Sequence, residues 1–191
     1  MANAARLVVG LGNPGGEYED TRHNVGFAVA DALAAKARTS FDHTEAQSLL
    51  GWGSVRGRRF GVAKPFTYMN RSGEAVRGLA RRYQLDPGEI LIVVDDIALP
   101  PGAVRLRPHG GDGGHNGLED IIARLGSDRF PRLRIGIGND FRRGHQADYV
   151  LSPFSAEEEP LISDAIVQAL DAAIAFSTDG VETAMNRYNR R

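Results

Sequence analysis

The sequence predicts a single-domain α/β fold built on a mixed β-sheet. Short apolar strand patterns alternate with helical patterns along the chain, and this alternation is typical of α/β proteins. Two of the strand patterns are joined by a turn into a hairpin, so the sheet is expected to be mixed and not purely parallel. The chain is long enough for one sizeable core and has no linker-like stretch, so we expect one domain over residues 1–191.

The first half of the chain opens with a strand that ends in glycines. An apolar run over residues 7–9 stops at Gly10-Leu11-Gly12-Asn13-Pro14-Gly15, which predicts a buried strand followed by a loop. Apolar residues then recur at helical spacing over residues 24–38. Strands are expected over residues 49–53 and 59–63, joined by a turn at 55–58, and a helix is expected from Ser72 through Tyr83.

The second half contains the most strand-like run of the chain. Residues 89–96 are apolar and β-branched until they reach Asp95-Asp96, which predicts a central strand covered on both faces, with two carboxylates at its end. The remaining elements expected are a strand over 103–107, a glycine-rich loop over 110–117, a helix over 118–126, a strand over 132–137, and helices over 155–176 and 181–188.

The composition is that of an ordinary soluble protein and excludes several classes of site. The chain has no cysteine, so disulfides, thiol nucleophiles and thiolate metal sites are excluded, and the cytoplasm is the simplest location. There is no apolar signal region at the start, and no apolar run is expected to span a membrane. The net charge of -1 argues against a protein that coats nucleic acid through bulk positive charge.

The arginines are nevertheless clustered. Arg105 and Arg107 alternate along one expected strand, and Arg132 and Arg134 alternate along another. Every second side chain of a strand lies on the same face, so each pair is expected to share a face. Such arginines can be ordinary solvent-exposed residues, but paired arginines on strands can also form a local phosphate-binding surface on a neutral protein.

Three interpretations of the opening loop compete. The glycines, with Asp31 about 20 residues further on, match the spacing of a dinucleotide-binding fingerprint. In that motif, however, the helix starts inside the glycines, whereas here the acidic segment 14–20 intervenes. The alternatives are a structural turn with a surface histidine, and a catalytic loop in which His23 is the base.

Asparagines and an aspartate are expected near His23. Asn13, Asn70, Asn116 and Asp95 all fall in expected loops or at strand ends. Each asparagine could be only a turn residue, since Asn tolerates turn geometry. Together with a histidine they favour the catalytic loop, because a neutral imidazole can take a proton from water. An aspartate would fix its tautomer, and amides would hold a carbonyl oxygen.

Five motifs follow one another between Arg6 and Gly138. They are Gly10-Leu11-Gly12-Asn13-Pro14-Gly15, the segment from Tyr18 to Arg22-His23-Asn24, the segment from Lys64-Pro65 to Tyr68-Met69-Asn70-Arg71-Ser72-Gly73, Asp95 with Leu99-Pro100-Pro101-Gly102, and Gly113-Gly114-His115-Asn116-Gly117. In this order and spacing they resemble the bacterial-type peptidyl-tRNA hydrolases. The resemblance implies cleavage of the ester between a peptide and tRNA, which recycles tRNA from prematurely released peptidyl-tRNA. It also implies a cytoplasmic monomer that needs no metal or cofactor, with a mixed, twisted central sheet surrounded by helices.

The resemblance also implies roles for individual residues. His23 matches the general base and Asp95 the carboxylate that orients it, while Asn13 matches the position that discriminates N-blocked peptidyl esters from free aminoacyl-tRNA. The matched contacts with the substrate are Tyr18, Tyr68, Asn70 and Asn116, with Met69 and His115 nearby, and the matched contacts with phosphate of the tRNA acceptor stem are Arg105, Arg107 and Arg134.

Two other functions remain open from the sequence. A metal-dependent hydrolase could use His109, Asp112 and His115 with the Asp95-Asp96 pair, since histidine and carboxylate are credible ligands for zinc or manganese. A non-catalytic module that binds tRNA or a nucleotide would explain the arginines, but it gives His23 and Asp95 no task.

Overall fold

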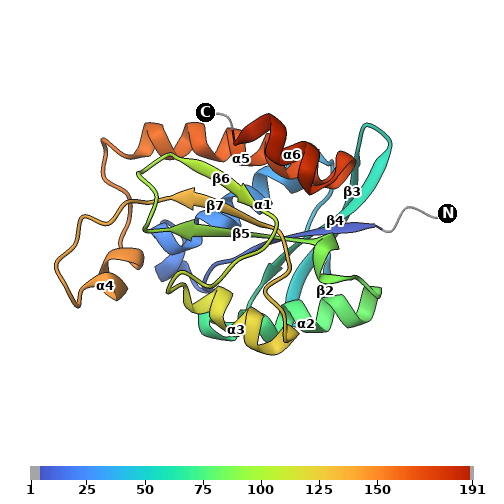
Figure 1. Cartoon of the computed structure of the whole chain (residues 1–191), viewed down its shortest axis with the longest axis horizontal. Helices are drawn as coiled ribbons and strands as arrows, with labels where there is room; N and C mark the ends of the chain where they lie inside the picture. Colours follow the sequence, from blue (N-terminus) through green and yellow to red (C-terminus); the bar gives the residue numbers. More distant parts are fainter. Residues whose placement is uncertain (1–4, 190–191) are drawn as a thin grey trace.

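The computed structural model describes residues 5–189, and its centre is a seven-stranded sheet in the order β2-β3-β4-β1-β5-β7-β6 (Figure 1). The strands β1, β4, β5 and β7 are parallel to one another, while β2, β3 and β6 pair antiparallel. The predicted mixed sheet is therefore confirmed. The bounds are β1 (Arg6–Gly10), β2 (His43–Glu45), β3 (Ser48–Val55), β4 (Arg58–Pro65), β5 (Ile90–Asp96), β6 (Val104–Arg107) and β7 (Arg132–Gly136).

Helices cover both faces of this sheet. In Figure 1 the C-terminal helices lie above it and α2 and α3 lie below it. The buried residues of α1, α5 and α6 form one core with one face of the sheet, and those of α2 and α3 form a second core with the other face. The bounds are α1 (Val25–Lys36), α2 (Ser72–Tyr83), α3 (Asn116–Leu125), α4 (Gln146–Val150), α5 (Glu159–Asp179) and α6 (Val181–Tyr188).

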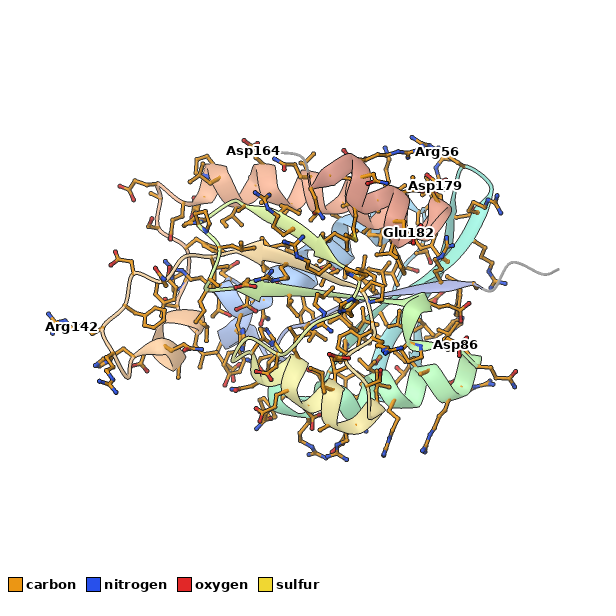
Figure 2. The ribbon with its side chains drawn as sticks, in the orientation of Figure 1. Arg56, Asp86, Arg142, Asp164, Asp179 and Glu182 are labelled. Atoms are coloured by element: carbon orange, nitrogen blue, oxygen red, sulfur yellow. The ribbon has the colours of Figure 1, made fainter. Side chains whose placement is uncertain are left out.

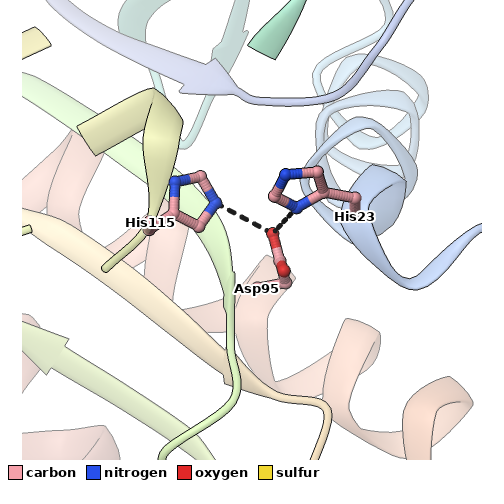
Figure 3. A group of neighbouring side chains, drawn as sticks. All are labelled: His23, Asp95 and His115. Atoms are coloured by element: carbon pink, nitrogen blue, oxygen red, sulfur yellow. Dashed lines mark hydrogen bonds and ion pairs between the residues drawn. The ribbon is translucent and has the colours of Figure 1, made fainter. Parts of the chain in front are cut away.

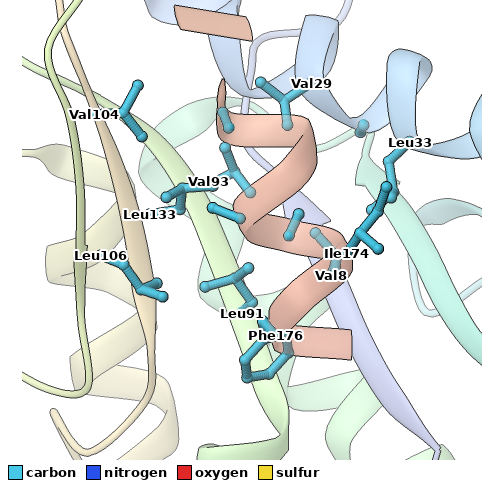
Figure 4. Close-up of a cluster of buried hydrophobic side chains, with 14 of the residues drawn as sticks. Val8, Val29, Leu33, Leu91, Val93, Val104, Leu106, Leu133, Ile174 and Phe176 are labelled. Carbon is cyan, nitrogen blue, oxygen red and sulfur yellow. The ribbon is translucent and has the colours of Figure 1, made fainter. Parts of the chain in front are cut away.

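The strand β5 shows why its sequence is apolar throughout. Leu91 and Val93 pack into the core beneath α1 and α5 (Figure 4), while Ile92 and Val94 pack into the core against α2 and α3. Alternate side chains thus enter opposite cores, and each buried aliphatic side chain stabilises the fold by roughly 1.5–3 kcal/mol. At its carboxyl end this strand delivers Asp95, still buried, beside the loop that follows β1.

The glycines after β1 serve close packing and do not form a dinucleotide-binding turn. A Cβ on Gly10 would lie 2.1 Å from the carbonyl oxygen of Gly26, and one on Gly26 would lie 2.5 Å from that of Val93. The first turn of α1 therefore rests directly on the ends of β1 and β5, which places the residues before it at the sheet edge. Since α1 begins at Val25, well beyond the glycines, the arrangement of the fingerprint is absent.

The long helix α5 is apolar because it is a core helix. Within residues 5–189 it alone has the length and composition of a membrane-spanning helix, contrary to our expectation that no stretch would. Its buried residues, however, pack against the sheet and against α1 and α6, in the core drawn in Figure 4.

Several predicted boundaries differ from the structure. The helix expected over 155–176 begins at Glu159, with Pro160 in its first turn, where proline loses no helical hydrogen bond. The helix expected from residue 118 begins two residues earlier, because His115 caps it. The three-residue strand β2 and the five-residue helix α4 were not predicted, since elements this short show no usable periodicity.

Candidate active site

The site is centred on a buried histidine and aspartate at the carboxyl ends of β1 and β5. His23 lies in a short 3-10 turn (Arg22–Asn24) that leads into α1. Its Nδ1 lies 2.8 Å from Oδ1 of Asp95, and both side chains are buried (Figure 3). Since a carboxylate only accepts hydrogen bonds, Nδ1 carries the proton and Nε2 is left as the basic nitrogen.

A second histidine shares the same carboxylate oxygen. Nε2 of His115 lies 2.9 Å from Oδ1 of Asp95 (Figure 3). Its Nδ1 accepts from the backbone N–H groups of Gly117 and Leu118, at 3.1 and 3.2 Å. The start of α3 therefore fixes the proton of His115 on Nε2, which donates to Asp95. The sequence placed His115 near the substrate or, in the metal-enzyme alternative, among the ligands together with Asp95. It did not predict this arrangement, because a histidine is not a typical helix cap.

The two histidines determine the charge state of Asp95. Burial by itself would raise the pKa of this carboxyl group, but the two imidazole donors outweigh it and hold its pKa well below the ordinary range of aspartate. Asp95 is therefore an anion at neutral pH.

Asn13 is held by three hydrogen bonds. Its backbone N–H donates to Oδ1 of Asn24 at 2.8 Å, and its carbonyl oxygen accepts from Nδ2 of Asn24 at 2.9 Å. The side-chain Oδ1 of Asn13 accepts from the backbone N–H of Met69 at 2.8 Å. Since the oxygen is used in this way, the NH₂ group is the part of the side chain that can donate to a ligand. Asn24 precedes α1 but its side chain makes no capping hydrogen bond and clamps Asn13 instead.

Six of the predicted site residues line one cavity of about 680 Å³: Asn13, His23, Tyr68, Asn70, Asp95 and Asn116. Asn70 lies in a 3-10 turn (Met69–Arg71) after β4, and Asn116 is the first residue of α3. Tyr18 does not line the cavity but packs edge-on against Tyr68, with 6.5 Å between ring centroids. The opposite wall, which the sequence did not reveal, is formed by α4 and the residue after it.

The arginines predicted to bind phosphate lie outside this cavity. Arg105 and Arg134 are directly opposite each other on β6 and β7, and Arg107 is exposed further along β6. Arg134 pairs with Asp96, the carboxylate that points away from His23. Arg132 is different, since its guanidinium is buried and donates to the carbonyl oxygens of neighbouring loops, including that of Gly111 at 2.8 Å.

The geometry disfavours a metal ion at this cluster. Among the described residues, His23, Asp95 and His115 are the group of three whose ligand atoms lie close enough to hold one. Their atoms are, however, 2.8 and 2.9 Å apart, as hydrogen-bonded donors and acceptors are. Ligands of zinc surround the ion at about 2.0–2.2 Å, so these atoms would have to separate to admit one. His109, proposed as a ligand, is exposed and lies outside the group.

Comparisons with known proteins agree with the resemblance seen in the sequence. The family model described as peptidyl-tRNA hydrolase matches residues 7–191. A peptidyl-tRNA hydrolase of Salinibacter ruber is 50% identical over 99% of this chain and 100% of its own length. One of Geobacillus thermodenitrificans is 46% identical over 96% of this chain and 99% of its own. The crystal structure of peptidyl-tRNA hydrolase from Acinetobacter baumannii, 38% identical, has a TM-score of 0.93 and covers 100% of this chain and 97% of that one.

Proposed function

Because the chain belongs to the peptidyl-tRNA hydrolase family and is a hydrolase of the ester bond in peptidyl-tRNA, we propose that His23 activates the attacking water. The observation that carries this proposal is the 2.8 Å contact between His23 Nδ1 and Asp95, which leaves Nε2 unprotonated beside the cavity. The enzymatic activity of the family argues against a non-catalytic module.

The reaction would proceed by proton transfer and acyl cleavage. Nε2 of His23 takes a proton from water as the water oxygen attacks the ester carbonyl carbon. Asp95 stabilises the imidazolium that forms. The bond from the acyl carbon to the ribose oxygen then breaks, and that oxygen takes the proton. The products are tRNA with a free terminal hydroxyl and a peptide carboxylic acid, which releases its proton to water to become a carboxylate.

The amides of the cavity would bind the acyl part of the substrate. The NH₂ group of Asn13 is free to donate to the carbonyl oxygen, where negative charge develops. Asn70 and Asn116 lie on the same cavity, as does Tyr68, whose ring Tyr18 supports. An N-blocked substrate offers a peptide carbonyl that an amide side chain of the cavity can bind, and a free aminoacyl-tRNA lacks this carbonyl. We propose that this difference is the basis for rejection of free aminoacyl-tRNA.

The tRNA would approach from the β6 side of the sheet. Arg105, Arg107 and Arg134 share the face that the register of β6 and β7 defines, and guanidinium groups suit phosphate oxygens. We propose that they contact the acceptor stem while the 3′ end enters the cavity. The lining of that cavity comes from segments between Asn13 and Leu151, and we propose that residues 1–191 act as a single domain. We also propose that the protein acts as a monomer in the cytoplasm.

The test is ester cleavage by purified variants. Wild-type protein should release N-acetylated amino acid from its tRNA with a chelator present, and should leave the unblocked aminoacyl-tRNA intact. His23→Ala should lose about 10²- to 10⁴-fold in rate while it still folds and binds tRNA. His43→Ala, in which an exposed histidine of β2 is removed, is the control and should retain full activity. Normal turnover by His23→Ala would refute the assignment, and loss of activity on chelation would favour a metal enzyme.

A further inference from the structure

One wall of the cavity needs support from the rest of the protein. The helix α4 contributes Gln146, Ala147 and Val150 to the lining, and Leu151 follows directly. A helix of five residues is too short to be stable by itself. The loop before it, residues 139–145, projects from the body of the protein, and Arg142 points away from it (Figures 1 and 2). Something else must therefore fix this wall.

The hydroxyl of Tyr149 in α4 donates to the carbonyl oxygen of Ile137 at 2.6 Å, and Arg22, the residue directly before His23, connects the wall to the turn that carries the base. The side chain of Arg22 is only 8% exposed, and Nη1 donates to Oγ of Ser152 at 2.6 Å and to the carbonyl oxygen of Pro153. Nη2 pairs with Glu158 at 2.6 Å. The guanidinium also lies 4.2 Å from the ring centre of Tyr149, within α4 itself.

The backbone reinforces the same junction. The N–H of Arg22 donates to the carbonyl oxygen of Ser152 at 3.0 Å, and Thr21 forms an isolated bridge with Pro153. The segment that joins α4 to α5 is thus bound to the turn that carries His23. A planar guanidinium can satisfy several acceptors and stack on a ring at once, which an ammonium group cannot.

We infer that Arg22 is a positioning residue that fixes the α4 wall of the cavity against the turn carrying His23. This inference rests on the roles proposed for His23 and for the cavity. His23 keeps its own anchor, Asp95, so the loss of Arg22 displaces the wall and leaves the base in place. The expected defect is therefore in substrate binding and not in the chemical step.

Arg22→Lys tests this directly, because it keeps a positive charge beside Glu158 and removes the planar guanidinium group. KM for N-acetylated aminoacyl-tRNA should rise by about tenfold, which corresponds to the loss of charged hydrogen bonds. By contrast, kcat should stay within about threefold of wild type, and its dependence on pH should not change. A purely structural role would lower the fraction of folded enzyme and would reduce kcat at constant KM.

Arg6→Lys is a matched control at the opposite end of the sheet. Nη1 of Arg6 donates to the carbonyl oxygens of Phe176 and Ser177, both at 3.1 Å, and its guanidinium lies over the ring of Phe176. This substitution removes the same kind of contacts far from the cavity, so it should lower stability and leave KM unchanged. A similar rise of KM in Arg6→Lys would overturn the inference.

Ser152→Ala decides the question if Arg22→Lys does not fold. It removes one acceptor of Arg22 and should raise KM about two- to threefold, again at nearly constant kcat. If Arg22→Lys folds and its KM is unchanged, the inference is overturned. If Arg22→Lys does not fold, an unchanged KM in Ser152→Ala overturns it. In either case an inactive His23→Ala leaves the proposed function standing, whereas an active His23→Ala refutes that function separately.

Discussion

The histidine cluster at the ends of β1 and β5 differs from the arginine face of β6 and β7 in how firmly its side chains are held. His23 and Asp95 are buried, and each orientation is fixed by a hydrogen bond of 2.8 Å. On the arginine face, Arg134 is held by its pairing with Asp96, but Arg107 is exposed. Within residues 5–189 the guanidinium of Arg105 bonds only to the carbonyl oxygen of its neighbour Val104.

The difference reflects what each region has to do. Proton transfer depends on atoms placed to within a few tenths of an ångström, so the base and its partners must be ordered before the substrate arrives. Attraction of a phosphate depends mainly on charge, which acts over several ångströms and tolerates a mobile side chain. Substitutions in the first region should therefore change rates strongly, and those in the second should change binding weakly.

The largest effect is expected from Asp95→Asn. The amide can still accept from His23, but it carries no charge to stabilise an imidazolium and can also present its NH₂ group to Nδ1. We expect kcat to fall on the order of 10²- to 10³-fold in single-turnover assays, with KM changed little. Asp96→Asn, one residue along and paired with Arg134, should lose less than about tenfold. Equal losses in the two variants would mean that the cluster is not specific to Asp95.

The carboxylate of Asp95 should also affect the stability of the fold in acid. The pKa of Asp95 is lowered in the folded protein, so its ionisation stabilises the fold above the ordinary aspartate value of about 3.9, and this contribution is lost as the pH falls below it. As the pH is lowered from about 6 to about 3, the free energy of unfolding of the wild type, measured with urea, should fall. The fall should be shallower in Asp95→Asn. Parallel curves would contradict the assigned shift.

An intermediate effect is expected from Asn24→Ala, which removes both hydrogen bonds that clamp the backbone of Asn13. With that amide less well placed, kcat/KM should fall by about tenfold, and the preference for N-blocked substrate should weaken. The chain offers a close control, because Asn189 clamps the backbone of Leu106 in the same two-point way, at 2.9 and 2.8 Å. Asn189→Ala should lower the melting temperature comparably and leave the preference for N-blocked substrate intact.

Much of the fold could be predicted because its signals are local. The continuous apolar run of β5 and the helical spacing in α1 follow directly from which side chains each element buries. Consecutive strand residues face opposite sides, so only one of Asp95 and Asp96 could reach His23. The resemblance to the family, through the spacing to Leu99-Pro100-Pro101-Gly102, favoured Asp95. The structure brings Asp95 to His23 and pairs Asp96 with Arg134.

The contacts that hold the site in place could not be predicted. The cap that His115 Nδ1 provides for α3 is a local contact, but histidine is not a typical cap residue. The bonds between Asn24 and Asn13 depend on how the loop after β1 packs against the start of α1. Arg132 shows the same limit. It alternates with Arg134 as a phosphate-binding residue would, yet it is buried and binds backbone carbonyl groups, and burial lowers its pKa.

The smallest effect is expected from Arg107→Ala, on the exposed arginine face. Each phosphate contact releases counterions, so the loss of one should weaken tRNA binding a few-fold at low salt and reduce the slope of log affinity against log salt by about one unit. In single-turnover assays at saturating enzyme, the cleavage rate should match wild type. Arg58→Ala, at the start of β4 beside the hairpin tip marked by Arg56 in Figure 2, removes the same charge far from the cavity and should leave the slope unchanged. If both variants gave the same slope, only the overall charge would matter. The catalytic cluster would then still be an ordered site, but the arginine face would not be a specific phosphate-binding surface.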